Sequence, residues 1–451
     1  MNANPYLLGP YAPVDDERTD LDLKVLGTLP PELDTLFVQD SPNPRLPPRG
    51  AYHWFDGDGM VHGVHIQGGR ASYRNRWIQT QGLAEELAAD QALYPGIMMP
   101  FEPGHPRDKD TANTDLVFHN GKLLALWWLG GAPYHLSVPE LETVGKLELP
   151  CGVAAHAKTD PRTGELIFFD YDPYKAPYMR YGVLDAQGAL VTLQDAELPR
   201  PALLHDLHFT ERYTILMDFP MWWDVDKLAQ GKRRVRFDGE QPARFGIVPR
   251  RGGTIRWFEA PGCYCYHAVN AWEEGDTVVL HACRIQDPVP RLRPEDEPDV
   301  PRLAFLRMEP YLHEWRFDMK TGAVSERRLS DTPTEFPRAN DSRLGVKTRY
   351  SWHPRVAREG TLLFDACVKM GGPEEVVHSY GEGCVGGETV FVPRPGATDE
   401  DDGWVLAFVT DRAEEQSEVR VLDGATMDLV ARILIPRRVP IGFHAHHVEP
   451  A

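Results

Sequence analysis

Short runs of alternating apolar and polar positions dominate the chain. Residues 52–80, YHWFDGDGMVHGVHIQGGRASYRNRWIQT, predict three strands joined by DGDG and QGG turns. Asp-Gly and Gly-Gly pairs supply the positive φ angles that tight hairpin turns require. The same pattern recurs in LVFHNGKLLALWW, TDPRTGELIFFDY, VLDAQGALVTL, WRFDMKTGAVSERRL and VAREGTLLFDACV. We therefore expect a fold built mainly from antiparallel hairpins.

Helical periodicity is rare by comparison. Residues 84–94 give the best helix candidate, and 225–231 a short one. Many short strands with frequent turn signals favour a sandwich, a barrel or a propeller. A chain of 451 residues is long for a single sandwich, so its length favours a propeller or several domains. The Pro-rich segment 287–302 is either a linker or a long loop.

Composition excludes several classes of protein. The net charge of −19, from 48 basic and 67 acidic residues, argues against a nucleic-acid partner, which needs clustered Lys and Arg. Six cysteines are too few for a disulfide scaffold. The N-terminal residues lack the basic and apolar regions of a signal peptide, and no apolar run is long enough to cross a bilayer. A reducing, cytoplasmic location is the expectation.

Four of the 17 histidines stand just before or within strand patterns, namely His156, His205, His267 and His444. Cys263, Cys265 and His267 alternate, so on a strand they would share one face and could form half a zinc site. No second pair of cysteines with zinc-site spacing exists in the chain, which makes this alternative weaker.

The sequence resembles the carotenoid cleavage oxygenases, a family that includes apocarotenoid-cleaving and lignostilbene-type enzymes. The resemblance rests on eight segments that follow the family's order over nearly the whole chain. They are DGDGMVHGVHI, DTANTDLVFHNGKLLALW, HAKTDP, LLHDLHFTERY, YHAVNAWEEGD, EFPR, VFVPRPGATDEDDGWVLAFV and VPIGFH.

This resemblance implies one seven-bladed β-propeller over residues 1–451, with a dome of loops and helices above an iron site on the axis. It implies one Fe(II) per chain, held by His156, His205, His267 and His444, while His446 and His447 match no ligand position. Glu335 and Glu388 match the glutamates that orient the ligand histidines. These six positions are 49, 62, 68, 53 and 56 residues apart, which is nearly even, as expected if each blade sends one residue to the axis.

The resemblance also implies the reaction. Molecular oxygen, the co-substrate, would bind at an open position of the iron and split a conjugated C=C bond into two carbonyl products, without an organic cofactor. We expect a carotenoid or apocarotenoid substrate. A stilbenoid or phenylpropenoid substrate is the first alternative, and a non-catalytic binding propeller is the second. The oligomeric state stays open.

The segment LLALWWLGG departs from the family's pattern. Leu129 stands where the family has a third orienting glutamate, and Trp128 stands where stilbene-cleaving members often have lysine. We expect Trp128, together with Phe219 and Trp222, to line the substrate tunnel. The apolar residues 94–101 would contribute peripheral contact with a membrane near the tunnel mouth.

Overall fold

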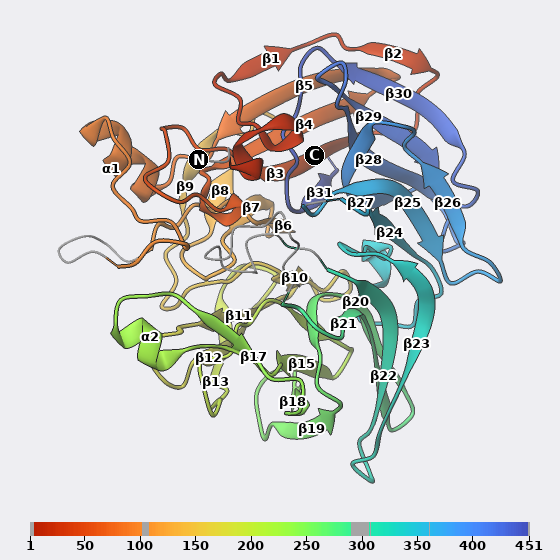
Figure 1. Cartoon of the computed structure of the whole chain (residues 1–451). Helices are drawn as coiled ribbons and strands as arrows, with labels where there is room; N and C mark the ends of the chain where they lie inside the picture. Colours follow the sequence, from red (N-terminus) through yellow and green to blue (C-terminus); the bar gives the residue numbers. More distant parts are fainter. Residues whose placement is uncertain (1–3, 102–107, 290–305, 307, 360, 450–451) are drawn as a thin grey trace.

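The strands form seven blades around a central axis (Figure 1). The computed structural model describes residues 4–101, 108–289, 306, 308–359 and 361–449. Neighbouring strands within each blade pair antiparallel, as the hairpin patterns predict. The prediction of an all-β, seven-bladed propeller is confirmed.

The first four blades follow one another in chain order, and all their strands except β31 lie between residues 18 and 260. Blade 1 comprises β1 (Arg18–Asp20), β3 (Thr35–Pro42), β4 (Gly59–Gln67), β5 (Arg70–Trp77) and β31 (Ala445–Val448). Blade 2 comprises β6 (Asp115–His119), β7 (Lys122–Leu126), β8 (Tyr134–Leu136) and β9 (Thr143–Lys146). Blade 3 comprises β10 (Lys158–Thr159), β11 (Leu166–Tyr171), β12 (Met179–Leu184) and β13 (Leu190–Asp195). Blade 4 comprises β14 (Leu207–Phe209), β15 (Tyr213–Asp218), β18 (Ala243–Pro249) and β19 (Arg256–Ala260).

The remaining blades complete the ring. Blade 5 comprises β20 (Tyr264–Glu274), β21 (Thr277–Ile285), β22 (Pro310–Asp318) and β23 (Val324–Pro333). Blade 6 comprises β24 (Ser351–Val356), β25 (Phe364–Met370) and β26 (Val376–Ser379), with residues 334–338 bridged to the inner side of β24. Blade 7 comprises β2 (Lys24–Gly27), β27 (Cys384–Pro393), β28 (Gly403–Asp411), β29 (Gln416–Asp423) and β30 (Leu429–Ile435). A single pair, Phe364 with Gly386, joins blades 6 and 7 into one sheet.

Both ends of the chain contribute to closing the ring. Near the N-terminus, β2 pairs with β30 of blade 7, and near the C-terminus β31 pairs with β3 of blade 1. Segments from opposite ends of the sequence are therefore held together by backbone hydrogen bonds. Whether residues 1–451 behave as one domain stays a prediction.

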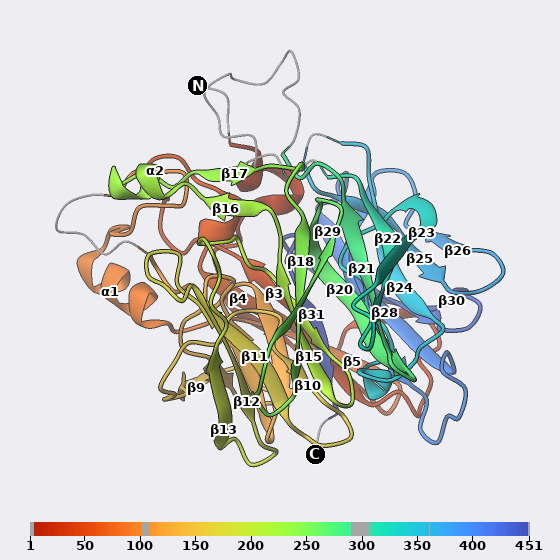
Figure 2. The same cartoon turned by 90° about the horizontal axis from the view of Figure 1, so that it is seen from below.

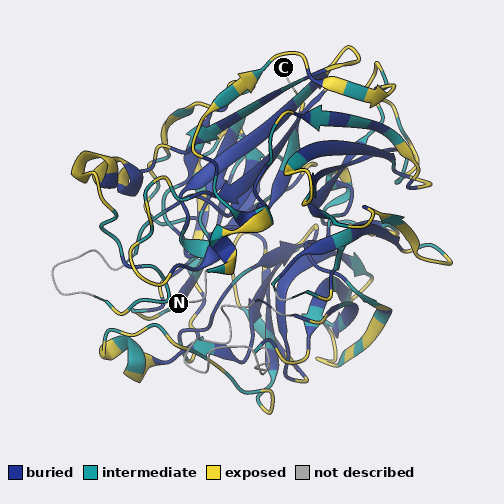
Figure 3. Ribbon diagram, turned by 45° about the horizontal axis from the view of Figure 1, so that its top comes forward, coloured by how far each residue is buried: buried dark blue, intermediate teal, exposed yellow. Residues whose placement is uncertain are grey.

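One end of the propeller is covered and the other carries the C-terminus (Figure 2). The hairpin of β16 (Met221–Trp223) and β17 (Val235–Phe237) lies across the covered end with helix α2 (Val225–Ala229). Helix α1 (Gln81–Ala89) projects from the rim, and its outer face is exposed (Figure 3). Both helices fall where the sequence predicts them, within a few residues, while 290–302 of the Pro-rich segment lies outside the described residues.

Three strands were expected in residues 52–80, and the first of them is not formed. Residues 54–56 form a short 3-10 helix, and only β4 and β5 are strands. His53 causes the difference, because its side chain accepts the Phe55 N–H while the Asp56 carboxylate accepts the His53 N–H. These two bonds cap a helical turn. The predicted QGG hairpin turn is present, with Gly68 at φ 57° and Gly69 at φ 75°.

Candidate metal centre

The structure brings four histidines from four blades together on the axis. His156 precedes β10, His205 precedes β14, His267 lies on β20, and His444 precedes β31. The ring centroids of five of the six pairs lie 4.5 to 5.0 Å apart. The even spacing in the sequence therefore corresponds to one contribution per blade at the centre of the ring.

The ring nitrogens of these histidines point at a common volume. The ligand atoms of His156, His205 and His267 all lie within 4.8 Å of one another, and the Nε2 atoms of His205 and His267 are 3.2 Å apart. The Nε2 atom of His156 is buried and has no hydrogen-bond partner. Converging imidazole nitrogens, one of them buried without a partner, fit a transition metal such as Fe(II). His444 adds a fourth ring, whose centroid is 4.5 Å from that of His156.

Burial keeps the four imidazoles neutral. It lowers the pKa of His156, His205 and His267 well below the usual value, and charge on neighbouring rings lowers it further. Burial also lowers the pKa of His444 to about 4. A metal ligand must be unprotonated, so the centre is prepared to bind a cation at neutral pH.

Two buried glutamates orient two of the rings. Glu335 accepts a hydrogen bond from Nδ1 of His267, and Glu388 accepts one from Nδ1 of His444 at 3.1 Å. Each bond commits Nδ1 as the donor, so Nε2 carries the free lone pair that faces the centre. Burial raises the pKa of Glu335 to about 8 and that of Glu388 to about 7. The structure thus places both glutamates beside the histidines, as the sequence led us to expect.

Asp115 is a further polar residue at the centre, and sequence reasoning missed it. It begins β6, the inner strand of blade 2, and its Oδ2 accepts the backbone N–H of His156 at 2.8 Å. His156 has φ +70°, a left-handed conformation that costs a non-glycine residue about 1–3 kcal/mol. The Asp115 bond holds that backbone. The sequence feature that could have indicated Asp115 is its place as an acidic residue at the start of the apolar strand DLVFH.

The position that faces the histidines in LLALWWLGG is Trp128, and the assignment of Leu129 to it was wrong. Trp128 lines an apolar cavity together with His205, His267 and His444, whereas Leu129 lines a separate cleft on the surface. His205 makes no hydrogen bond to a carboxylate among the described residues. Its ring contacts His267 and lies edge-on to Tyr266, with centroids 4.8 Å apart.

The cavity above the histidines is almost entirely apolar. Besides the histidines, Tyr266 and Thr114, it is lined by Trp54, Phe55, Trp128, Leu306, Met308, Phe336, Leu362 and Phe443. Such a lining suits a lipophilic ligand and excludes water. Phe336 immediately follows Glu335, and Phe443 immediately precedes His444. Since both phenylalanines line the cavity, it lies directly against the candidate centre.

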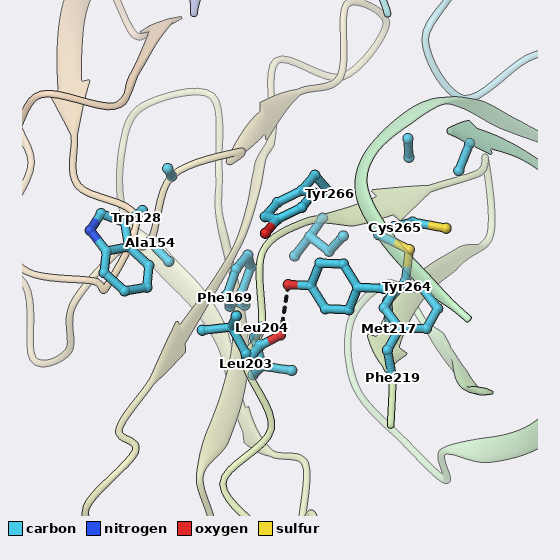
Figure 4. Packing of buried hydrophobic residues seen from close by; sticks show 14 of the residues in the cluster. Trp128, Ala154, Phe169, Leu203, Leu204, Met217, Phe219, Tyr264, Cys265 and Tyr266 are labelled. Atoms are coloured by element: carbon cyan, nitrogen blue, oxygen red, sulfur yellow. Dashed lines mark hydrogen bonds between the residues drawn. The ribbon is translucent and has the colours of Figure 1, made fainter. Parts of the chain in front are cut away.

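Two predicted tunnel residues lie elsewhere. Phe219 is buried in the core of blade 4, with its ring 5.5 Å from that of Tyr264, and Figure 4 shows it away from Trp128. Trp222 is half-buried beneath the guanidinium of Arg200, 4.3 Å from its ring centroid. On β16 the side chains of Met221 and Trp223 are buried and that of Trp222 faces outward, because successive residues of a strand point to opposite sides.

The zinc alternative finds no support in the geometry. Cys263 and Cys265 are buried in the hydrophobic core. Among the described residues, the converging group that contains His267 consists of histidines and includes neither cysteine.

Comparison with known proteins gives this centre its context. The sequence model of the family described as "Retinal pigment epithelial membrane protein" matches residues 11–449. Carotenoid 9,10(9',10')-cleavage dioxygenase of Crocus sativus is 36% identical, covering 98% of this chain and 89% of that protein. Carotenoid cleavage oxygenase of Mycobacterium tuberculosis is 31% identical, covering 98% of this chain and 97% of that protein.

The chain belongs to the carotenoid cleavage oxygenase family.

Solved structures agree with this assignment. Lignostilbene dioxygenase of Pseudomonas brassicacearum is 28% identical with a TM-score of 0.90, covering 99% of this chain and 98% of that one. Synechocystis apocarotenoid oxygenase is 25% identical with a TM-score of 0.86, covering 98% of both chains. This carotenoid oxygenase is therefore an oxygen-incorporating oxidoreductase.

No helix within the described part of the chain has the length and apolar character needed to span a membrane. Residues 94–101 form turns and bends rather than a strand, as expected, with half-buried apolar side chains such as Ile97 and Met98. Membrane contact through this segment and a cytoplasmic location stay predictions.

Proposed function

We propose that this carotenoid oxygenase holds one Fe(II) through His156, His205, His267 and His444. The supporting observation is that their neutral rings converge, and that three of them, His205, His267 and His444, line one wall of an apolar cavity. Four imidazoles would leave two positions of an octahedral ion open. When bound, the iron supplies the reactivity toward O2.

We infer that the substrate is a carotenoid or apocarotenoid, and that the reaction splits one conjugated C=C bond. One alkene and one O2 give two carbonyl products, so atoms and electrons balance without a further reductant. The protein's part is to hold the double bond beside the centre, and aromatic side chains such as Phe55, Trp128 and Phe443 provide flat apolar surfaces for a polyene. The same side chains keep water from the reacting atoms.

Trp128 supports the polyene over a hydroxystilbene. A site built to bind a phenol hydroxyl needs a buried polar partner that discriminates for it. Tryptophan offers one N–H donor and no base. The hydroxyl of Tyr266 is the polar group most able to serve such a substrate, but burial raises its pKa, so it stays protonated.

A stilbenoid substrate is the second candidate. The likeness to lignostilbene dioxygenase and the hydroxyls of Tyr266 and Thr114 in the cavity favour it. The test is product analysis after incubating iron-loaded protein under ¹⁸O₂ with an apocarotenal and, separately, with resveratrol. We expect kcat/KM to be higher for the apocarotenal, with ¹⁸O in both carbonyl products. Rapid cleavage of resveratrol with the apocarotenal intact would reverse the two substrate classes, and no cleavage of either would contradict both.

A further inference from the structure

A second cavity reaches the histidines from the opposite side. It has a volume of about 490 Å³ and borders His156, His267 and His444. Phe443 lines the apolar cavity, whereas His446 and His447, which follow His444 on β31, line this one. Strand β31 leads toward the end of the propeller that carries the C-terminus (Figure 2), and Glu449 also lines the cavity. The candidate centre therefore separates two cavities.

The two cavities differ in chemical character. The second is lined by five carboxylates and only two basic side chains, namely Asp115, Asp206, Asp341, Glu388, Glu449, Lys158 and Arg338. Lys158 is paired with Asp206, and Arg338 with Asp341. Moving a hydrated divalent cation into an apolar space without ligands costs several kcal/mol or more of desolvation free energy. The acidic cavity offers the path with the lower barrier.

His446 and His447 lie along this path, and neither is needed to explain the centre. Nδ1 of His446 is 3.9 Å from Oδ2 of Asp341, and the two imidazole centroids are 5.9 Å apart. Nδ1 of His447 is buried without a hydrogen-bond partner. Among the described residues, the ring nitrogens of His446 and His447 are not part of a compact group of the kind made by His156, His205 and His267. Such spacing suits brief contact with a metal rather than its retention.

We propose that the acidic cavity is the route by which a divalent metal reaches the four-histidine centre, with His446 and His447 as transient ligands during entry. This inference rests on the proposed function, because it assumes that the four histidines bind the metal. His446 and His447, which match no ligand position of the family, would thereby have a role in metal entry. The substrate would enter from the other, apolar side.

The test is the rate of metal loading into metal-free full-length protein. Co²⁺ is a suitable probe, followed by its absorption bands or by quenching of tryptophan fluorescence in a stopped-flow instrument. The His446→Gln/His447→Gln double variant should load at least about tenfold more slowly at equal Co²⁺ concentration. Its equilibrium Kd should be unchanged, because transient ligands speed entry and exit equally. Turnover per bound iron should also be unchanged.

Two further variants distinguish a role in metal entry from a general effect of substitution on the folded protein. Glu449 is exposed at the cavity, so Glu449→Gln leaves packing intact and should also slow loading, by a smaller factor. His135 lies on β8 outside both cavities, so His135→Gln should load at the parent rate. Equal loading rates for the parent, the double variant and Glu449→Gln would overturn the entry route alone. A parent protein that shows no Co²⁺ signal would instead overturn the proposed metal centre.

Discussion

Glu335 holds the ring of His267, and its contribution to metal binding can be measured with an isosteric change. Glu335→Gln keeps an oxygen that can accept the Nδ1 hydrogen bond, but it cannot take on the negative charge that a cation bound at the centre would favour on the carboxylate. Loss of such a partner typically lowers metal affinity by about 10–100-fold. We expect that loss for Fe(II), measured by anaerobic competition with a chelator. Glu375→Gln is the control, because Glu375 binds Ser330 and Thr332 away from the centre. Equal Fe(II) affinities for both variants would show that the charge of Glu335 contributes nothing to metal binding.

Trp128 occupies the position from which a carboxylate could reach the cavity beside His205. We expect Trp128→Glu to bind Fe(II) about 10–100-fold more tightly than Trp128→Leu, since both lose the indole and only one gains a carboxylate. Leu129→Glu places the same carboxylate in the surface cleft and should bind Fe(II) as the parent does. The same competition assay applies. Indistinguishable affinities for Trp128→Glu and Trp128→Leu would mean that another group already orients His205.

Single residues near the centre differ in how far the sequence reveals them. The histidines and glutamates stand in distinctive segments such as VPIGFH and EFPR, so they could be named in advance. Asp115 could not, because its role depends on a bond to the backbone of His156, 41 positions later in the chain. Phe219 and Trp222 were misplaced because an aromatic residue near a turn gives no sign of which side it faces.

At the scale of elements, strand β14 carries a buried histidine that links stability to pH. Burial lowers the pKa of His208 to about 3, and its Nδ1 accepts the Phe209 N–H at 2.8 Å. The unfolded chain binds a proton near pH 6.5, so stability is fully present above that pH and is lost as pH falls toward 3. Between pH 7 and pH 5 this histidine alone should cost about 2 kcal/mol of folding free energy.

The comparison that isolates this effect is urea unfolding of the parent and of His208→Asn at pH 7 and pH 5. Asparagine keeps an acceptor for the Phe209 N–H but does not titrate. The parent should lose about 2 kcal/mol more than the variant over this range. His135→Asn, at a partly exposed site, should show a smaller difference. If His208→Asn follows the parent's pH dependence, then His208 is not the neutral buried group described above.

Hairpins were the elements that the sequence predicted well. The turn between β6 and β7 has Asn120 at φ 49° and Gly121 at φ 68°, which is the conformation that an Asn-Gly pair favours. Local chemistry determines such turns. Residues 54–56 were predicted incorrectly because a histidine side chain caps the turn there, and histidine is not among the usual capping residues.

At the scale of the whole molecule, the propeller brings residues far apart in sequence to one axis. The near-even spacing of the six candidate residues agrees with one contribution per blade, and the order of the blades follows the order of the chain. Ring closure by β2 and β31 was not predictable, because their partners lie some 400 residues away and short strands carry little pairing information. The acidic cavity likewise depends on side chains from several blades.

In the proposed centre, four histidines, and not their neighbours on β31, hold one iron per chain. The most direct test is the iron content of protein loaded anaerobically with Fe(II) and then desalted, for the parent and for five single variants. These are His156→Ala, His205→Ala, His267→Ala, His444→Ala and His446→Ala. We predict one iron per chain in the parent and in His446→Ala after full equilibration, and a large loss in the other four. Full iron content in His444→Ala together with its loss in His446→Ala would show that His446, and not His444, is the terminal ligand.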